Sequence, residues 1–439
     1  MSFSLAWRRF QTKTRDRLLH SRTVRQITAR SLLSRVPVTS GKSEPNAIAR
    51  SVLQLCRVAR LSSSESFAKK VETEIGKQVD RIGSSPVDWP SLTSEWKTDR
   101  IEKAVVLKPW AGPQEPGVVL VSFDYQWPRL MGIRNLTEFS QRYKLVLAPT
   151  WSPPHCLETT LFPAQYPASE IYTLISNEQD LRIFPRLSSK FRAVPLYASN
   201  WVNPELYRSV PFAEKDIDIV MLAGFGTYKR HFALFEALRD LPAGLRVVLM
   251  GTASGKRTAA ALHEEARAFG VDGRFELRES ASDSEVLRNL SHAKVSLILS
   301  NQEGSCVAVV EAMFAGTPVG LYEDAIVGSK AFINERTGML FTRGKLAPQL
   351  EKFLAAAATF APREWALENQ ISCLGSTETL NRILKADALA AGEMWTQDIA
   401  VHHWRPDPVL LYPEDRSRLQ PAYEDIQTRH GVALGPRPA

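Results

Sequence analysis

Two carboxylates flank the start of an apolar segment late in the chain. The segment 306–315 is apolar except at Glu311, and Glu303 lies just before it, followed by Gly304 and Ser305. A carboxylate among apolar side chains needs a hydrogen-bond partner or a pKa raised by burial. At the start of a helix, free backbone amides and the positive end of the dipole favour an anion. Together these features are typical of an anion-binding helix terminus.

The spacing of these residues suits a nucleotide sugar. Gly304 and Glu311 are two helical turns apart, about 10.5 Å at 1.5 Å per residue. One carboxylate could hold hydroxyls of a transferred sugar, the helix terminus a diphosphate, and the other carboxylate the ribose. The alternative is that Glu303 is only an N-terminal helix charge and Glu311 a core residue with its own partner.

Three basic residues form a second unusual feature. Lys229, Arg230 and His231 stand at the start of a predicted helix, after a strand that ends near Gly224 and Gly226. Cations are disfavoured at the positive end of a helix unless an anion lies between them. This arrangement favours a bound diphosphate, and the alternative is a solvated Lys-Arg pair.

Two series of alternating strands and helices would position these residues. The first contains predicted strands at 118–123, 144–147, 171–175 and 191–196. The second contains predicted strands at 217–222, 246–250, 274–277, 295–299 and 319–322, with helices at 229–239, 256–269, 284–290 and 305–315 between them. Such alternation predicts α/β structure with doubly wound parallel sheets, whose ligand lies at the carboxyl ends of the strands. Two such halves in tandem would face a cleft.

The second series resembles the nucleotide-binding half of the retaining GT-B glycosyltransferases of the group 1, or family 4, type. Glu303 to Glu311 matches that family's E-x7-E signature, and 311–319 looks like its EAMAxGxPV continuation. The segment 247–251 resembles its strand-and-glycine element, and 337–340 its TGxL. The resemblance covers about residues 215 to 345 and implies a GT-B fold of two Rossmann-like domains.

The resemblance also implies roles for individual residues. Glu303, Lys229 and Arg230 would be the catalytic residues. Glu303 would contact the donor sugar, Glu311 the ribose and Lys229 the diphosphate. The remaining donor-binding positions implied are Gly226, Gly251, Gly304, Ser305, Cys306 and Val307. Phe225 stands where the family has an Arg, so Arg230 could substitute for it, and the glycine pair expected after the first strand is replaced by 122–127.

The activity implied is transfer of a sugar from a nucleotide diphosphate, with retention, to a hydroxyl of a carbohydrate or lipid-linked acceptor. Fixed cations and helix dipoles can stabilise the charges of that reaction, so no metal and no cofactor are expected. Asp124 and His155 follow predicted strands and could face the acceptor, although each is also explained as a structural residue. Two alternatives are a degenerate GT-B scaffold or binding protein and a GT-B-fold sugar-nucleotide epimerase.

Charge is concentrated at the N-terminus. The chain of 439 residues has a net charge of +8, but residues 1–60 hold 13 Lys or Arg against two acidic residues, which leaves −3 for the rest. The arm mixes these cations with apolar residues, so we consider contact with an anionic membrane face, a solvated or partly helical tail, or a transit peptide. Nucleic-acid binding is not expected, because no motif supports it.

Composition narrows the class of protein further. With 44% hydrophobic and 23% charged residues and no apolar run of bilayer length, the chain is typical of a soluble globular protein. Its four separated cysteines form no CxxC pair and indicate a reducing compartment. We therefore expect a cytoplasmic protein, peripheral at the membrane if the arm binds lipid. The predicted domains are a basic arm (1–60), a helical extension (61–100), an acceptor domain (101–212), a nucleotide-sugar-binding domain (213–385) and a tail (386–439).

Overall fold

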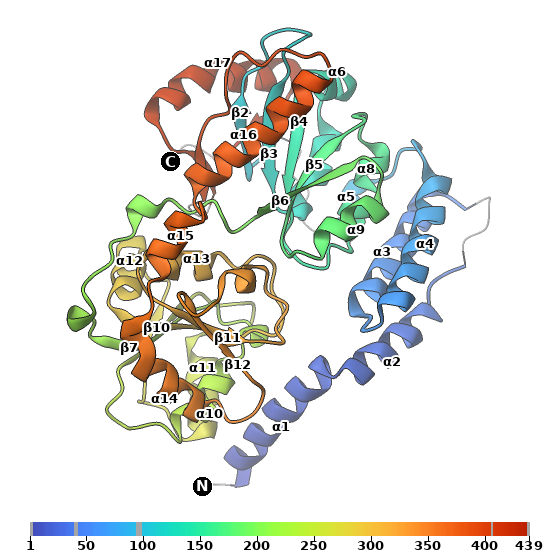
Figure 1. Cartoon of the computed structure of the whole chain (residues 1–439). Coiled ribbons are helices and arrows are strands. Elements are labelled where there is room, and N and C mark those ends of the chain that lie inside the picture. The colour runs from blue at the N-terminus through green and yellow to red at the C-terminus, as the bar shows by residue number, and fades with distance from the viewer. Residues whose placement is uncertain (1–2, 39–42, 94–98, 405–406, 437–439) are drawn as a thin grey trace. The chain divides into compact units, whose positions relative to one another are not determined.

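A computed structural model describes residues 3–38, 43–93, 99–404 and 407–436 (Figure 1). Parts of the predicted arm, helical extension and tail, at 1–2, 39–42, 94–98, 405–406 and 437–439, lie outside the described residues. The chain forms two compact units. Unit 1 comprises 1–20 and 202–372, and unit 2 comprises 21–201 and 373–439.

Unit 1 is built on a parallel sheet whose order is β12-β11-β10-β7-β8-β9 among the described residues. Its strands are β7 (Ile217–Leu222), β8 (Val247–Gly251), β9 (Glu276–Glu279), β10 (Ala293–Ile298), β11 (Val319–Tyr322) and β12 (Gly338–Phe341). Numbered along the chain, this is the 3-2-1-4-5-6 order of a dinucleotide-binding fold. The strand order reverses between the parallel neighbours β7 and β10. A ligand is therefore expected at the carboxyl ends of these two strands.

Helices cover the sheet of unit 1. They are α1 (Phe3–His20), α10 (His231–Leu238), α11 (Ala259–Phe269), α12 (Asp283–Ser291), α13 (Val307–Phe314), α14 (Ala347–Ala356) and α15 (Pro362–Glu368). Short 3₁₀ turns connect them: η2 (Pro204–Leu206), η3 (Phe212–Glu214), η4 (Thr227–Lys229), η5 (Gly328–Phe332) and η6 (Ala357–Thr359). Helix α13 packs against β10 and β11, and α1 lies on α11. The core joins apolar residues of the central strands with those of α10 and α11.

Unit 2 has a second sheet, with the order β2-β3-β4-β5-β6 among the described residues. Its strands are β2 (Ala104–Lys108), β3 (Gly117–Ser122), β4 (Tyr143–Ala148), β5 (Ile171–Ile175) and β6 (Phe191–Tyr197). β2 runs antiparallel to β3, and the other pairs are parallel. Short ladders also join β1 (Arg100–Ile101) to β15 (Ala433–Leu434) and β13 (His402–Trp404) to β14 (Pro408–Leu410).

The helices of unit 2 come from both ends of the chain. They are α2 (Arg22–Leu33), α3 (Pro45–Leu61), α4 (Glu65–Ile82), α5 (Trp89–Leu92), η1 (Asp124–Gly132), α6 (Leu136–Arg142), α7 (Leu157–Thr160), α8 (Phe162–Gln165), α9 (Asp180–Leu187), α16 (Cys373–Ala390) and α17 (Pro413–His430). α3 packs against α4, α16 contacts β6, and α17 contacts β2 (Figure 1). One hydrophobic core includes residues from all of these layers.

The predicted α/β class with parallel sheets is confirmed, but the domain boundaries differ from those predicted. Residues 1–60 do not form one arm, because α1 belongs to unit 1 while α2 and α3 belong to unit 2. The inner face of α3 is core, with Val52 and Leu55 buried. The predicted tail 386–439 belongs to unit 2, and its helix α17 buries Leu419 and Ile426 there. The split between the two central units falls at 201/202 and not at 212/213.

Candidate functional site

The candidate site lies where β7 and β10 end side by side in unit 1. The loop after β7 contains Gly224, Phe225 and Gly226 and leads through η4 into α10. The loop after β10 leads through Glu303 into α13. The two predicted motifs, far apart in sequence, are therefore neighbours at the reversal of strand order.

Lys229 and Glu303 form an ion pair between these two loops. Lys229 Nζ lies 2.6 Å from Glu303 Oε1 and 2.7 Å from Oε2, and both side chains are largely buried. Ser300 Oγ donates a hydrogen bond of 2.5 Å to Oε1. Burial of the ammonium opposes its charge, but the Glu303 carboxylate prevails and raises the pKa of Lys229. Lys229 is therefore a fixed, charged group in the candidate site.

The loop before α13 is held by backbone hydrogen bonds to the chain after β11. Glu303 N donates to Ile326 O at 2.8 Å, Gly304 O accepts from Gly328 N at 2.9 Å, and Ser305 O accepts from Ser329 N at 3.0 Å. Cys306 is the N-cap of α13, with φ of 60°, and its side chain makes no capping bond. The first amides of a helix have no partner within the helix, so the start of α13 at Val307 presents donors.

Cys306 lies among the charged groups of the site. Its thiol is close enough to Glu303, Lys229 and Glu311 to feel their charges. Burial raises the pKa of Cys306, so the thiol stays protonated and is unsuited to act as a nucleophile.

Glu311 is a half-buried carboxylate on α13. Tyr207, after η2, donates a hydrogen bond of 2.9 Å from its hydroxyl to Glu311 Oε1. Burial raises the pKa of Glu311, which that hydrogen bond only partly offsets. Tyr207 was missed by the sequence analysis, because nothing in the sequence brings it next to a residue 104 positions away.

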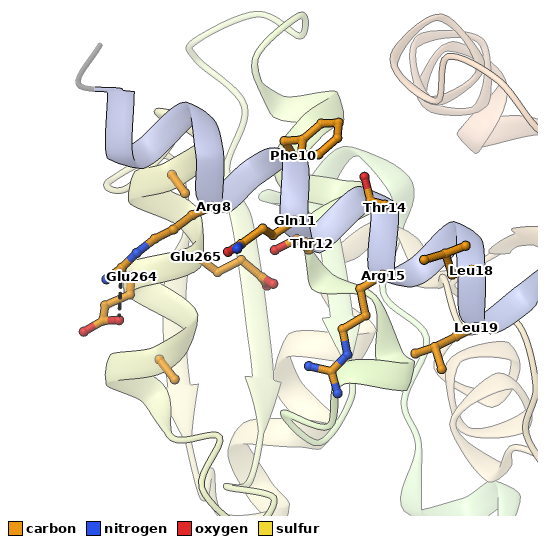
Figure 2. A pocket seen from close by; sticks show the side chains of 12 residues that line it. Arg8, Phe10, Gln11, Thr12, Thr14, Arg15, Leu18, Leu19, Glu264 and Glu265 are labelled. Atoms are coloured by element: carbon orange, nitrogen blue, oxygen red, sulfur yellow. Dashed lines mark hydrogen bonds and ion pairs between the residues drawn. The ribbon is translucent and has the colours of Figure 1, made fainter.

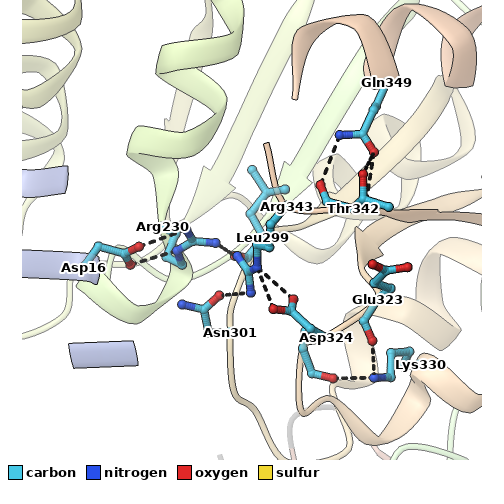
Figure 3. Close-up of polar contacts among 11 residues, drawn as sticks. Asp16, Arg230, Leu299, Asn301, Glu323, Asp324, Lys330, Thr342, Arg343 and Gln349 are labelled. Atoms are coloured by element: carbon cyan, nitrogen blue, oxygen red, sulfur yellow. Dashed lines mark hydrogen bonds and ion pairs between the residues drawn. The ribbon is translucent and has the colours of Figure 1, made fainter. Parts of the chain in front are cut away.

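The three predicted cations behave differently from one another. Lys229 lies in η4, and Arg230, with φ of 57°, is the N-cap of α10. The guanidinium of Arg230 pairs with Asp16 of α1 (Figure 3). His231 is not a cation, because burial lowers its pKa to about 3. The charges of Lys229 and Arg230 are thus offset by two carboxylates of the chain itself, Glu303 and Asp16.

Three other positions in this region are explained by packing. Phe225, which stands where the resembled family has an Arg, is fully buried. A Cβ at Gly251 would lie 2.1 Å from Ala223 O, so the end of β8 requires glycine. A Cβ at Gly226 would lie 2.6 Å from the ring of Tyr228, which folds back beneath Lys229 at 5.2 Å. Gly226 and Gly251 therefore shape the loops that carry the charged residues.

Asp124 and His155, the predicted acceptor residues, lie in unit 2. Asp124 follows β3 and accepts hydrogen bonds from Thr150 Oγ1 at 2.8 Å and Tyr125 N at 3.0 Å, and burial raises its pKa. His155 Nε2 lies 2.8 Å from Glu72 Oε1, and the imidazole is buried. Both side chains thus have partners within unit 2, as the structural explanation of them requires.

Glu72 of α4 is the centre of this second cluster and was missed by the sequence analysis. It accepts hydrogen bonds from Arg186 Nε at 2.8 Å and Nη2 at 3.1 Å in addition to its contact with His155. Burial opposes its charge, but these two partners lower the pKa of Glu72 to about 2. Its position next to Val71, on the apolar face of α4, was the available signal.

Two kinds of feature are absent from the described part of the chain. No group of three or more His, Cys, Asp or Glu residues in it could hold a metal ion. None of its helices is both long and apolar enough to cross a membrane.

Residues 202–359 match the sequence model of a family described as Glycosyl transferases group 1. No curated protein matches the chain.

Several solved structures resemble part of this chain. Anabaena Alr3699/HepE in complex with UDP has a TM-score of 0.49 at 17% identity, over 61% of this chain and 78% of that one. Sucrose-phosphate synthase from Thermosynechococcus elongatus has a TM-score of 0.48 at 17% identity, over 63% and 74%. The pneumococcal O-GlcNAc transferase GtfA in complex with UDP and GlcNAc has a TM-score of 0.41 at 15% identity, over 58% of this chain and 54% of that one.

Proposed function

We propose that this chain, whose residues 202–359 carry a group 1 glycosyl transferase domain, moves a sugar from a nucleotide diphosphate to an acceptor hydroxyl with retention and without a metal. The observation that carries the proposal is the Lys229–Glu303 pair at the reversal of strand order, inside the matched segment. A buried cation beside a carboxylate and a helix N-terminus is suited to a diphosphate sugar. The cation and the helix amides would bind the anionic diphosphate, and the carboxylate would accept hydrogen bonds from the sugar hydroxyls.

Each group would act at one part of the donor. Glu303 accepts hydrogen bonds from hydroxyls of the sugar, and Glu311 accepts those of the ribose. Lys229 and the amides at the start of α13, from Gly304 to Val307, stabilise the charge that develops on the diphosphate. The bond between the anomeric carbon and the phosphate oxygen breaks. The acceptor oxygen bonds to that carbon from the same face, and its proton passes to the departing phosphate.

Two observations favour a degenerate binding protein as the second candidate. Phe225 occupies the place of a diphosphate-binding Arg and is buried, and Arg230 already pairs with Asp16. A protein of this kind would bind nucleotide weakly or not at all and would turn over no donor. An epimerase, the third candidate, would convert the donor with no acceptor present.

We include peripheral contact with an anionic membrane at the cytoplasmic face in the proposal, with α1 as the contact. Trp7 and Leu18, about three turns apart on one side of α1, are 51% and 52% exposed, and Phe10 stacks on Trp7 at 5.5 Å. Lys13 and Asp16 on the opposite side pair with unit 1. The exposed side of α1 thus carries large apolar side chains together with exposed arginines, which favours a partner that is both apolar and anionic.

A cavity of about 750 Å³ runs along the same helix (Figure 2). It is lined by Phe10, Leu18 and Leu19 of α1 and by Glu264 and Glu265 of α11, among others. Arg15 extends beside Leu18 and Leu19 toward it. Because Glu264 already pairs with Arg8 and Glu265 with Arg257, the apolar side chains and Arg15 are left to suit the acyl chains and head groups of anionic lipids.

The experiment that tests the transferase is thermal stability of the full chain with UDP, GDP, ADP and their sugars. A nucleotide at about 100 times its dissociation constant should add roughly 2.7 kcal/mol to the free energy of unfolding. Lys229→Ala and Glu311→Ala should each reduce the shift, whereas Lys352→Ala, an exposed position on α14, should leave it unchanged. Release of nucleoside diphosphate from the stabilising donor then identifies turnover. Absence of any shift would contradict the proposal and favour the degenerate protein.

A further inference from the structure

Helix α1 is attached to unit 1 through charged residues. Arg8 Nη1 lies 3.3 Å from Glu264 Oε2 on α11, and Lys13 pairs with Glu236 on α10. The third pair, Asp16–Arg230, joins residues 214 positions apart in the sequence. It is also the most buried of the three, because the exposed fractions of its side chains are only 15% and 9%.

The Asp16–Arg230 contact is a two-point ion pair. Arg230 Nε lies 2.8 Å from Asp16 Oδ1, and Nη2 lies 2.9 Å from Oδ2 (Figure 3). Asp16 Oδ1 also lies 3.6 Å from His20 Nε2, one turn further along α1. Two parallel hydrogen bonds between a guanidinium and a carboxylate fix direction as well as distance.

The rest of the guanidinium of Arg230 is surrounded. Nη1 donates to Leu299 O, just after β10, at 3.1 Å. Its Cζ lies 5.2 Å from the ring centroid of Phe232 and 5.3 Å from that of Tyr322. Arg343 lies over the same Tyr322 ring and pairs with Asp324 (Figure 3). Asp16 therefore closes the remaining side of a site that is built for the Arg230 side chain.

The backbone of Arg230 links the surroundings of its guanidinium to Lys229. Arg230 has the left-handed φ of 57°, which a non-glycine residue keeps only when its surroundings impose it. Its N–H donates to Thr227 O at 3.1 Å and its carbonyl accepts from Ala233 N at 2.9 Å, so it joins η4 to α10. Lys229, the residue before it, reaches Glu303 in the candidate site. Fixing Arg230 thus fixes the direction in which Lys229 leaves the backbone.

We infer that Asp16 of α1 is a positioning residue for the loop 226–230 that carries Lys229. It acts as an internal counter-ion that holds Arg230, and so the diphosphate-binding lysine, in place. The inference extends the proposed function, on which the role of Lys229 rests. It also explains why Arg230 need not contact the donor, since its charge is already matched by the chain.

The test compares Asp16→Asn with Asp16→Glu in the full chain. Lys13→Gln is the control, because it removes a neighbouring ion pair of the same helix that does not touch the loop. Hydrogen exchange of the amides at 226–231 reads the loop itself, whether or not nucleotide binds. Titration with the nucleotide found in the stability panel, or with UDP if none is found, reads the donor site.

In Asp16→Asn we expect exchange at 226–231 to rise about tenfold or more, with the melting temperature within a few degrees of the control's. Nucleotide affinity should fall about tenfold, and Asp16→Glu should recover part of both losses. Exchange at 226–231 that matches the wild-type protein would overturn the inference. Raised exchange in a protein whose wild type binds no nucleotide would support the positioning of the loop and refute the proposed function.

Discussion

At the scale of single residues, the Lys229–Glu303 pair is more informative than either residue alone. Removing one partner from a buried ion pair leaves the other charged and desolvated, so each residue of this pair satisfies the charge of the other. A bound diphosphate sugar offers an anion to Lys229 and hydroxyls to Glu303. When the ligand binds, each side chain can therefore replace its ion-pair partner with a group of the ligand. This property is the reason for assigning the pair a role in binding as well as in structure.

Glu72 provides a test of the electrostatics of unit 2. Its pKa in the fold is about 2, below the ordinary value of 4.5, so its stabilisation is complete above about pH 4.5 and is lost as the pH falls through 2. We expect Glu72→Gln to lower the free energy of unfolding by about 3 kcal/mol at pH 6 and by roughly half of that at pH 3. Urea denaturation at both pH values measures the difference.

The control for Glu72 is Glu74→Gln, the same change at a more exposed position of α4. Asp180, a second buried carboxyl in unit 2 whose pKa burial raises to about 6, is present in every variant and cancels from the comparison. A cost for Glu72→Gln that stays constant between pH 6 and 3 would refute a contribution from the charge of Glu72.

Sequence patterns identified the residues of the candidate site that lie within motifs and missed their distant partners. Glu303 and Lys229 were predicted from a helix start and a loop, and the structure brings them together. Asp16 and Tyr207 were not predicted, because an ion pair or hydrogen bond between remote segments leaves no local signal. Glu72 was predictable in principle, since an acidic residue on an apolar helix face needs a buried partner.

At the scale of elements, the parallel strands were the easiest part to predict. Strands buried on both faces are largely apolar runs, so β5 and β11 begin and end where the sequence indicated. The same holds for β7, where Asp218 interrupts the apolar run. The start of α10 was predicted two residues early, at 229, because no pattern reveals the left-handed backbone of Arg230. The strands β2 and β12 were not predicted; β2 pairs antiparallel at an edge, outside the alternating series.

Helix α3 gives the prediction at this scale. Leu55 is buried in the core of unit 2, within the residues that the charge pattern had assigned to a basic arm. We expect Leu55→Ala to lower the free energy of unfolding of unit 2 by about 2–5 kcal/mol, through lost burial and the cavity left behind. Arg57→Ala, at an exposed position of the same helix, should change it by less than about 0.5 kcal/mol. Equal effects of the two substitutions in urea denaturation would mean that α3 is a loosely attached arm.

At the scale of the whole molecule, each end of the chain belongs to a unit whose other residues are distant in sequence. The N-terminal 20 residues join the unit formed by 202–372, and the C-terminal segment from 373 joins the unit formed by 21–201. Composition predicted a separate arm and tail, because it records charge and proline but not which core a segment enters. Helix α1 belongs to unit 1 because it contacts α11, and α17 belongs to unit 2 because it contacts β2. Both contacts join segments that are far apart in the sequence.

The exposed side of α1 gives the last prediction. In vesicle co-sedimentation, the full chain should bind membranes that contain roughly one third anionic lipid, through Trp7 and Leu18 and the cations around them. Trp7→Ser with Leu18→Ser should weaken binding about tenfold or more, because two apolar side chains lose their burial. The matched control is Leu389→Ser, at a leucine of α16 that is 55% exposed, and this change should leave vesicle binding unaltered.

Salt separates the two contributions to that binding. Raising it from about 0.1 M to about 1 M shortens the screening length from about 10 Å to about 3 Å, so attraction to the excess positive charge of residues 1–60 should be lost while apolar insertion remains. Binding that falls with salt but ignores Trp7 and Leu18 would mean that the charge alone attracts the protein. Binding to neither anionic nor neutral vesicles would contradict the membrane contact that the proposal includes.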